Sequence, residues 1–203
     1  MNDPINLWEL QNELSDGCEV VCGVDEAGRG PLAGPVCAAA VILPKNLVIE
    51  GLNDSKKLTE KKREALYDEI VKNAVSYGIA FASVEEIEEI NILSAALLAM
   101  NRAIVQLDPH PQLALVDGNT TRSIALPAKA VVGGDGKCAA IAAASVLAKV
   151  TRDRLMYKLA EEYPQYGFEK HKGYGTKAHY AALDEYGPSP VHRMSFLKKY
   201  YAK

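Results

Sequence analysis

The stretch VVCGVDEAGRG, residues 20–30, decides the architecture of this chain. Its opening apolar run stands ahead of turn signals, which predicts a buried strand over residues 19–25. Two adjacent acids, Asp25 and Glu26, then close the strand, and an uncompensated charge is costly to bury. The local sequence offers only Arg29 as a partner. A divalent cation is the natural counter-ion, because hard cations take carboxylate oxygens as ligands.

The rest of the chain predicts an α/β layer structure around this strand. A second apolar run, residues 35–44, follows after about nine residues, which is too few for a parallel crossover and therefore predicts a hairpin. A short helix or arm precedes the first strand within residues 1–17. Apolar periodicity predicts three further strands and three helices, over 77–84, 113–117 and 128–132 and over 59–76, 85–107 and 138–161 respectively. Thr59 is placed to cap the first of these helices.

Composition predicts one globular unit. The chain has 203 residues, of which 48% are hydrophobic and 24% are charged. We expect a single domain over residues 1–203, with a C-terminal helical part from about 138. No apolar run approaches the roughly 18–20 residues of a membrane helix, and the N-terminus does not resemble a secretion signal, so we expect no membrane association and a cytoplasmic location.

Cysteine spacing and charge distribution narrow the class of protein further. The four cysteines lack the spacing of a zinc site and are predicted to be free thiols. The net charge of −3 argues against an unspecific nucleic-acid binder. Near the C-terminus, however, lysines are mixed with glycines and tyrosines, a pattern that suits local contact with phosphates. For the bases at 61–63 we favour a solvated helix face.

Three predicted strands end in acids, namely at Asp25 with Glu26, at Asp117 and at Asp135. Ligands of open α/β sheets bind beyond the carboxyl ends of strands, so these acids are expected to converge. Four carboxylates in one cleft repel one another, and two divalent ions roughly 3.5–4 Å apart relieve this and suit in-line phosphoryl displacement. Taken alone, Asp117 is predicted to be a turn residue. The fact that three predicted strands end in acids leaves that alternative open.

Side-chain alternation raises a geometric question about the first two acids. Neighbours on a strand point to opposite faces, so Asp25 and Glu26 share a site only if the strand ends between them or twists sharply. Gly28 and Gly30 make such a break plausible. The same glycines also fit a dinucleotide-binding pattern, but Gly34-Pro35 interrupts the helix that such a site needs, and we reject it.

Seven motifs in order then point to one family: DEAGRG at 25–30, DSKKL at 54–58, VDG at 116–118, GD at 134–135, AAAS at 142–145, HKGYGT at 171–176 and HRMSF at 192–196. Over about residues 19–197 the chain closely resembles bacterial ribonuclease HII, the type 2 ribonuclease H. Motifs in register are far more specific than any single match. The resemblance implies a ribonuclease H-like fold, with a central mixed five-stranded sheet flanked by helices and a C-terminal helical segment.

The resemblance also implies an activity and a metal. It predicts an endoribonuclease that cuts the RNA strand of RNA–DNA hybrids and cuts 5′ of single ribonucleotides in duplex DNA, with a role in ribonucleotide excision repair. The implied cofactor is Mg²⁺ or Mn²⁺, with two ions when substrate is bound. The family's acids match Asp25, Glu26, Asp117 and Asp135, as metal ligands and catalytic residues. Products with 5′-phosphate and 3′-hydroxyl fit a metal-activated water.

The resemblance assigns substrate contacts as well. The backbone of Gly28, Arg29 and Gly30 is implied to approach the ribose, whose 2′-hydroxyl distinguishes RNA from DNA, and Tyr174 to pack on the nucleotide at the RNA–DNA junction. Lys56 and Arg193 are expected to contact phosphates. Without the motif, Tyr174 reads as a loop aromatic that covers the core.

The partner implied is an RNA–DNA hybrid or a DNA duplex containing ribonucleotides, bound by a monomer. The alternative function is a non-catalytic protein that binds RNA–DNA hybrids. Intact acids at all four positions speak against it.

Overall fold

The computed structural model describes residues 6–53, 55 and 58–202, and its centre is a five-stranded mixed sheet. The strands lie in the order β3-β2-β1-β4-β5. They span Val21–Ala27 (β1), Val36–Ile42 (β2), Ser76–Ala82 (β3), Leu113–Asp117 (β4) and Ala128–Val131 (β5). β1 pairs antiparallel with β2 and parallel with β4, which confirms the leading hairpin and the mixed α/β sheet.

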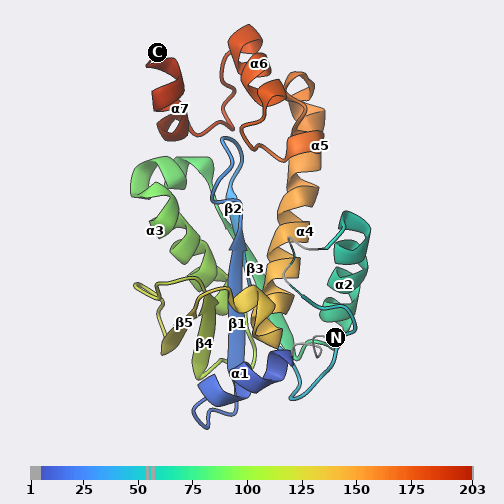
Figure 1. Cartoon of the computed structure of the whole chain (residues 1–203). Helices are drawn as coiled ribbons and strands as arrows, with labels where there is room; N and C mark the ends of the chain where they lie inside the picture. Colours follow the sequence, from blue (N-terminus) through green and yellow to red (C-terminus); the bar gives the residue numbers. More distant parts are fainter. Residues whose placement is uncertain (1–5, 54, 56–57, 203) are drawn as a thin grey trace.

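Helices cover both faces of this sheet (Figure 1). The helices of the central layers are α1 (Leu7–Leu14), α2 (Glu60–Asn73), α3 (Val84–Ile104) and α4 (Ala139–Glu162). Cys22 and Val24 of β1 pack in one core cluster with α3, whereas Ala39 and Val41 of β2 pack with α2 and α4 on the opposite face. The two-residue alternation of the strands therefore builds a core on each side.

The small residues at the start of α4 allow this helix to lie directly on β1. A Cβ atom added at Gly23 would meet the main-chain carbon of Ala140 at 2.1 Å and the main-chain nitrogen of Ile141 at 2.2 Å. Most residues of the first turns of α4 are fully buried alanines. The helix backbone therefore contacts the strand backbone, which larger side chains on either element would prevent.

Helix α3 differs from the continuous helix that the sequence predicts over 85–107. Asn91 has φ 67° and ψ 162°, which breaks the helix into two segments. Its Oδ1 accepts hydrogen bonds from the backbone N–H groups of Leu93 and Ser94, so Asn91 acts as the N-cap of the second segment. At the first segment, Ser83 and Glu86 form a capping box.

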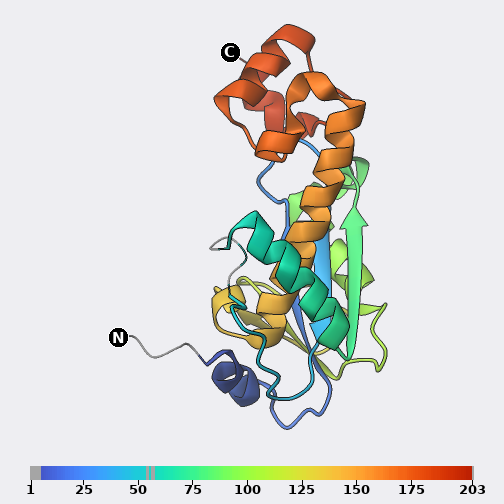
Figure 2. The same cartoon turned by 90° about the vertical axis from the view of Figure 1, so that its right-hand side faces the viewer.

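Beyond the sheet, α4 extends to a second group of short helices, as Figures 1 and 2 show. These are η3 (Pro164–Tyr166), α5 (Phe168–His171), α6 (Lys177–Tyr186) and α7 (Met194–Tyr201). Their own core includes Phe168, Leu183 and Leu197, and it also takes in Leu32 and Ala33 from the β1–β2 loop. The loop that follows the opening acids is thereby fixed between the sheet and the C-terminal helices.

The structure also bears on the expected free cysteines and on the expected lack of a membrane helix. The thiols of Cys18, Cys22, Cys37 and Cys138 are free, and all but the first are buried. In the part of the chain that the structure describes, no helix combines the length and apolarity that crossing a membrane requires.

Candidate active site

Three of the four predicted acids meet at one edge of the sheet. Oxygen atoms of Asp25, Asp117 and Asp135 all lie within 4.8 Å of one another. The first two come from the adjacent parallel strands β1 and β4, and Asp135 comes from η2 (Gly134–Gly136), a turn just after β5 rather than a strand end. Asp117 accepts a 2.7 Å hydrogen bond from the Gly134 N–H, which fixes the turn to β4.

The electrostatics of this group favour a bound cation. Asp25 is 3% exposed, and burial raises the pKa of its carboxyl well above the usual value, with the charges of Glu26 and Asp117 raising it further. Such a site holds hard oxygen donors and an excess of negative charge. A divalent cation removes the repulsion and takes the carboxylates as ligands, so the donor set fits Mg²⁺ or Mn²⁺.

Glu26 lies outside this group of three. The strand does not break after Asp25 but stays paired to β2 through Ala27. By alternation Glu26 falls on the face of Cys22 and Val24, opposite to Asp25. Its carboxylate accepts a hydrogen bond of 3.2 Å from Nη1 of Arg29. The predicted break between the two acids is therefore absent, and Glu26 lies beside the loop that follows.

Sequence reasoning gave no role to the serine that supports Asp25. Ser145 of α4 lies near the Asp25 carboxylate and lowers its pKa, and its Oγ lies 2.7 Å from Oγ of Ser55. Both hydroxyls are buried. A serine that closes a run of buried alanines is the signal that identifies such a residue, because a buried hydroxyl needs a partner.

Two buried arginines, Arg152 and Arg193, donate hydrogen bonds to backbone carbonyls of the loop from Gly28 to Pro35. Arg152 of α4, which the sequence did not single out, donates to the carbonyl oxygens of Ala33, Pro35 and Lys172, each at 3.1 Å. Gly28 has φ +100°, and a Cβ there would lie 2.0 Å from Nε of Arg152. This close approach requires glycine at residue 28.

Tyr174 lies beside the exposed end of this loop. Its side chain is 46% exposed, and a Cβ added at Gly30 would lie 3.5 Å from its ring. The N–H of Leu32 donates to the carbonyl of Gly173 at 2.8 Å, so the loop and the tyrosine segment are joined through their backbones. The motif residues Gly30 and Tyr174, far apart in the sequence, thus form one surface, and the loop of Gly30 follows directly on the strand of Asp25.

The two predicted phosphate contacts have different outcomes. Lys56 lies outside the described residues. Arg193 is fully buried, and its guanidinium donates to the carbonyls of Gly28, Arg29 and Gly34. Because a group without exposed surface cannot reach a phosphate, the structure corrects this expectation and gives Arg193 a role inside the protein.

The acid group of the described residues contains three aspartates, and the buried histidines lie elsewhere. His179 and His192 are buried, with their Nε2 atoms 3.0 Å apart. Burial lowers the pKa of His192 to about 4, so its ring is neutral at pH 7. These rings belong to the packing of the C-terminal helices rather than to the chemistry of the acids.

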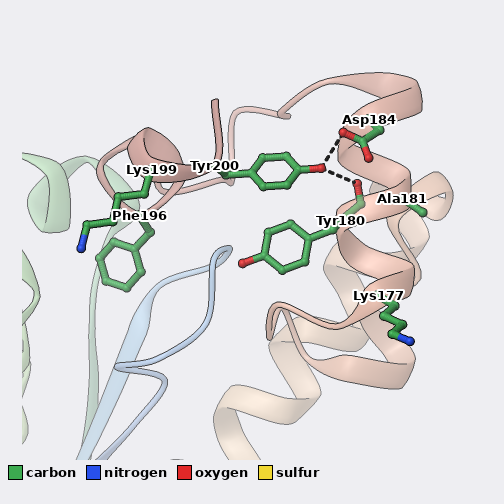
Figure 3. A pocket seen from close by; sticks show the side chains of 7 residues that line it. All are labelled: Lys177, Tyr180, Ala181, Asp184, Phe196, Lys199 and Tyr200. Atoms are coloured by element: carbon green, nitrogen blue, oxygen red, sulfur yellow. Dashed lines mark hydrogen bonds between the residues drawn. The ribbon is translucent and has the colours of Figure 1, made fainter. Parts of the chain in front are cut away.

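A groove of about 710 Å³ lies between α6 and α7 and is lined by Lys177, Tyr180, Ala181, Asp184, Phe196, Lys199 and Tyr200 (Figure 3). Its two lysines lie on opposite sides, and neither has an ion-pair partner among the described residues. The carboxylate of Asp184 accepts a hydrogen bond from the Tyr200 hydroxyl. Tyr180 joins this groove to the tyrosine segment, since a Cβ at Gly175 would lie 2.9 Å from its hydroxyl.

Comparisons with known proteins agree with this geometry. The family described as Ribonuclease HII matches residues 22–199. A protein of Caldicellulosiruptor saccharolyticus named ribonuclease HII is 54% identical over 194 residues, or 95% of each chain. One of Burkholderia pseudomallei with the same name is 57% identical over 178 residues, covering 88% of this chain and 83% of its own. The crystal structure of ribonuclease H2 from Pyrococcus horikoshii has a TM-score of 0.71 at 28% identity, covering 91% of this chain and all of that one.

Proposed function

The chain belongs to the ribonuclease HII family, and we propose that it cuts duplex DNA on the 5′ side of a single embedded ribonucleotide. It is a metal-dependent endoribonuclease that acts on RNA–DNA hybrids. The observation that carries the finer proposal is the adjacency of two features. Asp25, one of three carboxylates within 4.8 Å of one another, stands directly ahead of a loop whose exposed Gly30 lies against the exposed Tyr174.

We assign Asp25, Asp117 and Asp135 to hold Mg²⁺ or Mn²⁺, with two ions when substrate is bound. We keep Glu26 as a proposed fourth ligand: it lies outside the group of three and accepts a hydrogen bond from Arg29, but its charge raises the pKa of Asp25, so the two carboxylates are close. The metal, when bound, lowers the pKa of the attacking water and stabilises the leaving oxygen. The products are then a 5′-phosphate and a 3′-hydroxyl.

The protein itself supplies orientation. The Glu26 N–H donates a 2.7 Å hydrogen bond to the Asp25 carboxylate, and the Gly134 N–H donates one of 2.7 Å to that of Asp117. Prepositioned ligands of this kind avoid reorganisation during the reaction. The backbone of Gly28 to Gly30 lies where it can approach the ribose 2′-hydroxyl, which is the group that separates RNA from DNA. Tyr174 offers its ring to the nucleotide beside it.

One assay separates this function from hybrid binding alone. A duplex with a single ribonucleotide is incubated with the protein and Mg²⁺ or Mn²⁺, beside the same duplex in DNA only. We expect cleavage 5′ of the ribonucleotide and an intact DNA control. Binding without cleavage in either metal would leave the non-catalytic alternative. The activity fits a role in removing ribonucleotides from DNA, with the protein acting as a monomer.

Replacing Tyr174 tests its predicted contact. We expect Tyr174→Ala to lower the cleavage rate at a single ribonucleotide by about tenfold to a hundredfold, because stacking on an aromatic ring contributes roughly 1–3 kcal/mol. Tyr174→Phe should keep most of the rate. Single-turnover kinetics and thermal melting are the measurements. Tyr186→Ala, which removes another exposed tyrosine on α6, should leave cleavage unchanged, and an unchanged rate in Tyr174→Ala would return Tyr174 to a purely structural role.

The lysines of the α6–α7 groove test whether this surface follows the phosphate backbone. In the double variant Lys177→Ala, Lys199→Ala, we expect weaker duplex binding and a slope of log K against log[salt] that is shallower by about 1–2, since each phosphate contact contributes about 0.9. Fluorescence anisotropy over a salt series measures both. The control is Lys45→Ala, Lys72→Ala, which removes the same charge from exposed positions. An equal change in both variants would leave only the net charge as the cause.

A further inference from the structure

The carbonyl groups of the β1–β2 loop point into the protein, toward a buried guanidinium. Arg193 donates from Nη2 to the Gly28 carbonyl at 2.7 Å, from Nη1 to the Arg29 carbonyl at 3.1 Å and from Nε to the Gly34 carbonyl at 2.9 Å. Its own backbone N–H donates to the carbonyl of Leu32 at 2.8 Å. One residue from the C-terminal segment therefore determines the direction of several peptide units of the loop.

Burying a cation at this position costs free energy unless its hydrogen bonds compensate for the lost hydration. Arg193 is fully buried, and this burial, with the charge of the nearby buried Arg152 as a second cause, lowers the pKa of Arg193 to about 9. The ring of Phe196 lies 5.2 Å from the guanidinium carbon and adds a cation–π contact. An apolar side chain would pack here without the free-energy cost of a buried charge. What it would lack is the set of hydrogen-bond donors of the guanidinium, so these donors explain why an arginine stands here.

Peptide geometry links these inward carbonyls to the exposed surface. In a trans peptide the C=O of one residue and the N–H of the next point in opposite directions. With the carbonyls of Gly28 and Arg29 turned toward Arg193, the N–H groups of Arg29 and Gly30 point away from it. Both residues are exposed, and no described residue accepts a hydrogen bond from either N–H.

We propose that Arg193 is a positioning residue for ribonucleotide recognition: it holds two backbone donors of the loop, the N–H groups of Arg29 and Gly30, outward beside Tyr174, where the ribose 2′-hydroxyl is read. The inference rests on the proposed function and adds a residue that does not touch the substrate. It also explains the residue type. A guanidinium directs several donors from one rigid plane, whereas an ammonium is a compact point charge on a flexible stem.

Discrimination between ribose and deoxyribose tests this role. The Kd is measured for a duplex with one ribonucleotide and for its all-DNA counterpart, in Ca²⁺ in place of Mg²⁺, for wild type, Arg193→Lys and Arg102→Lys. We expect the ratio of the two Kd values to fall at least about tenfold in Arg193→Lys, because a lysine cannot hold both carbonyls. The control Arg102→Lys, on α3, removes a guanidinium that likewise donates to a backbone carbonyl, that of Phe81 at 2.9 Å, as well as to the carboxylate of Glu86. It should keep the ratio within about twofold.

The outcomes separate the inference from the function on which it rests. A wild-type protein without preference for the ribonucleotide contradicts the proposed function. A wild-type preference that Arg193→Lys retains overturns the role of Arg193 alone, as does an equal loss in Arg102→Lys. If Arg193→Lys melts below the assay temperature, NMR on the wild-type protein provides the test. The backbone ¹⁵N–¹H signals of Arg29 and Gly30 must shift when the ribonucleotide duplex binds and not when the DNA duplex binds. Unshifted signals overturn the outward orientation of these N–H groups.

Discussion

Asp25→Asn should abolish cleavage while leaving hybrid binding within about threefold of wild type. The variant keeps the shape and the hydrogen-bond acceptor of Asp25 but removes the most buried carboxylate of the three that meet at the sheet edge. We expect a loss of at least about a thousandfold in single-turnover rate, which corresponds to about 4 kcal/mol of transition-state stabilisation. Gel assays with Mg²⁺ and with Mn²⁺ measure the rate, and anisotropy measures binding.

The same substitution should stabilise the metal-free protein. In the folded state the pKa of Asp25 is raised above its ordinary 3.8 by burial and by the charges of Glu26 and Asp117. Its ionisation therefore destabilises the fold, starting as the pH rises through 3.8 and reaching its full effect above the raised folded-state pKa. In EDTA at pH 7–8, Asp25→Asn should melt above wild type, and the difference should shrink toward pH 4.

Metal titration completes this test. Mn²⁺ should raise the melting temperature of wild type, because a ligand that binds only the folded state stabilises it, and should raise that of Asp25→Asn much less. Asp68→Asn makes the same chemical change at an exposed site on α2 and should behave as wild type. Full activity in Asp25→Asn would remove Asp25 from the metal site.

Gly23→Ala should strongly destabilise the fold. The added Cβ would lie 2.1 Å from the main-chain carbon of Ala140, and both backbones are fixed within β1 and α4. Neither can move away without separating the strand from the helix that carries Ser145. We expect a loss of about 3 kcal/mol or more in the free energy of unfolding, the upper range for overpacking a core.

Urea denaturation measures this loss, and a glycine of the loop provides the control. A Cβ at Gly30 would make only an ordinary contact of 3.5 Å with Tyr174, so Gly30→Ala should unfold within about 0.5 kcal/mol of wild type, as expected for a surface change. A Gly23→Ala protein of wild-type stability would show that α4 shifts away from β1 at little cost.

Much of the fold followed from local patterns, and the differences have local physical causes. The hairpin and Thr59 as the cap of α2 agree with the structure, because run length and capping chemistry act within a few residues. The break in α3 was missed, although Asn91 and Ser94 give a capping signal, because the apolar spacing of neighbouring residues continues through it. Asp135 was assigned to a strand end and lies in a turn, since Gly133 in the left-handed conformation ends the extended chain first.

The sequence by itself determined the acids, the glycine loop and the tyrosine, because these residue types in this order fit one chemistry. Tertiary structure alone decided how they are held. It placed Asp25 and Glu26 on opposite faces of β1, since the strand continues beyond both acids. It also turned Arg193, which reads as a surface base, into a buried donor to the loop carbonyls. Exposure and direction depend on the elements packed around a residue, and those elements lie far away in the sequence.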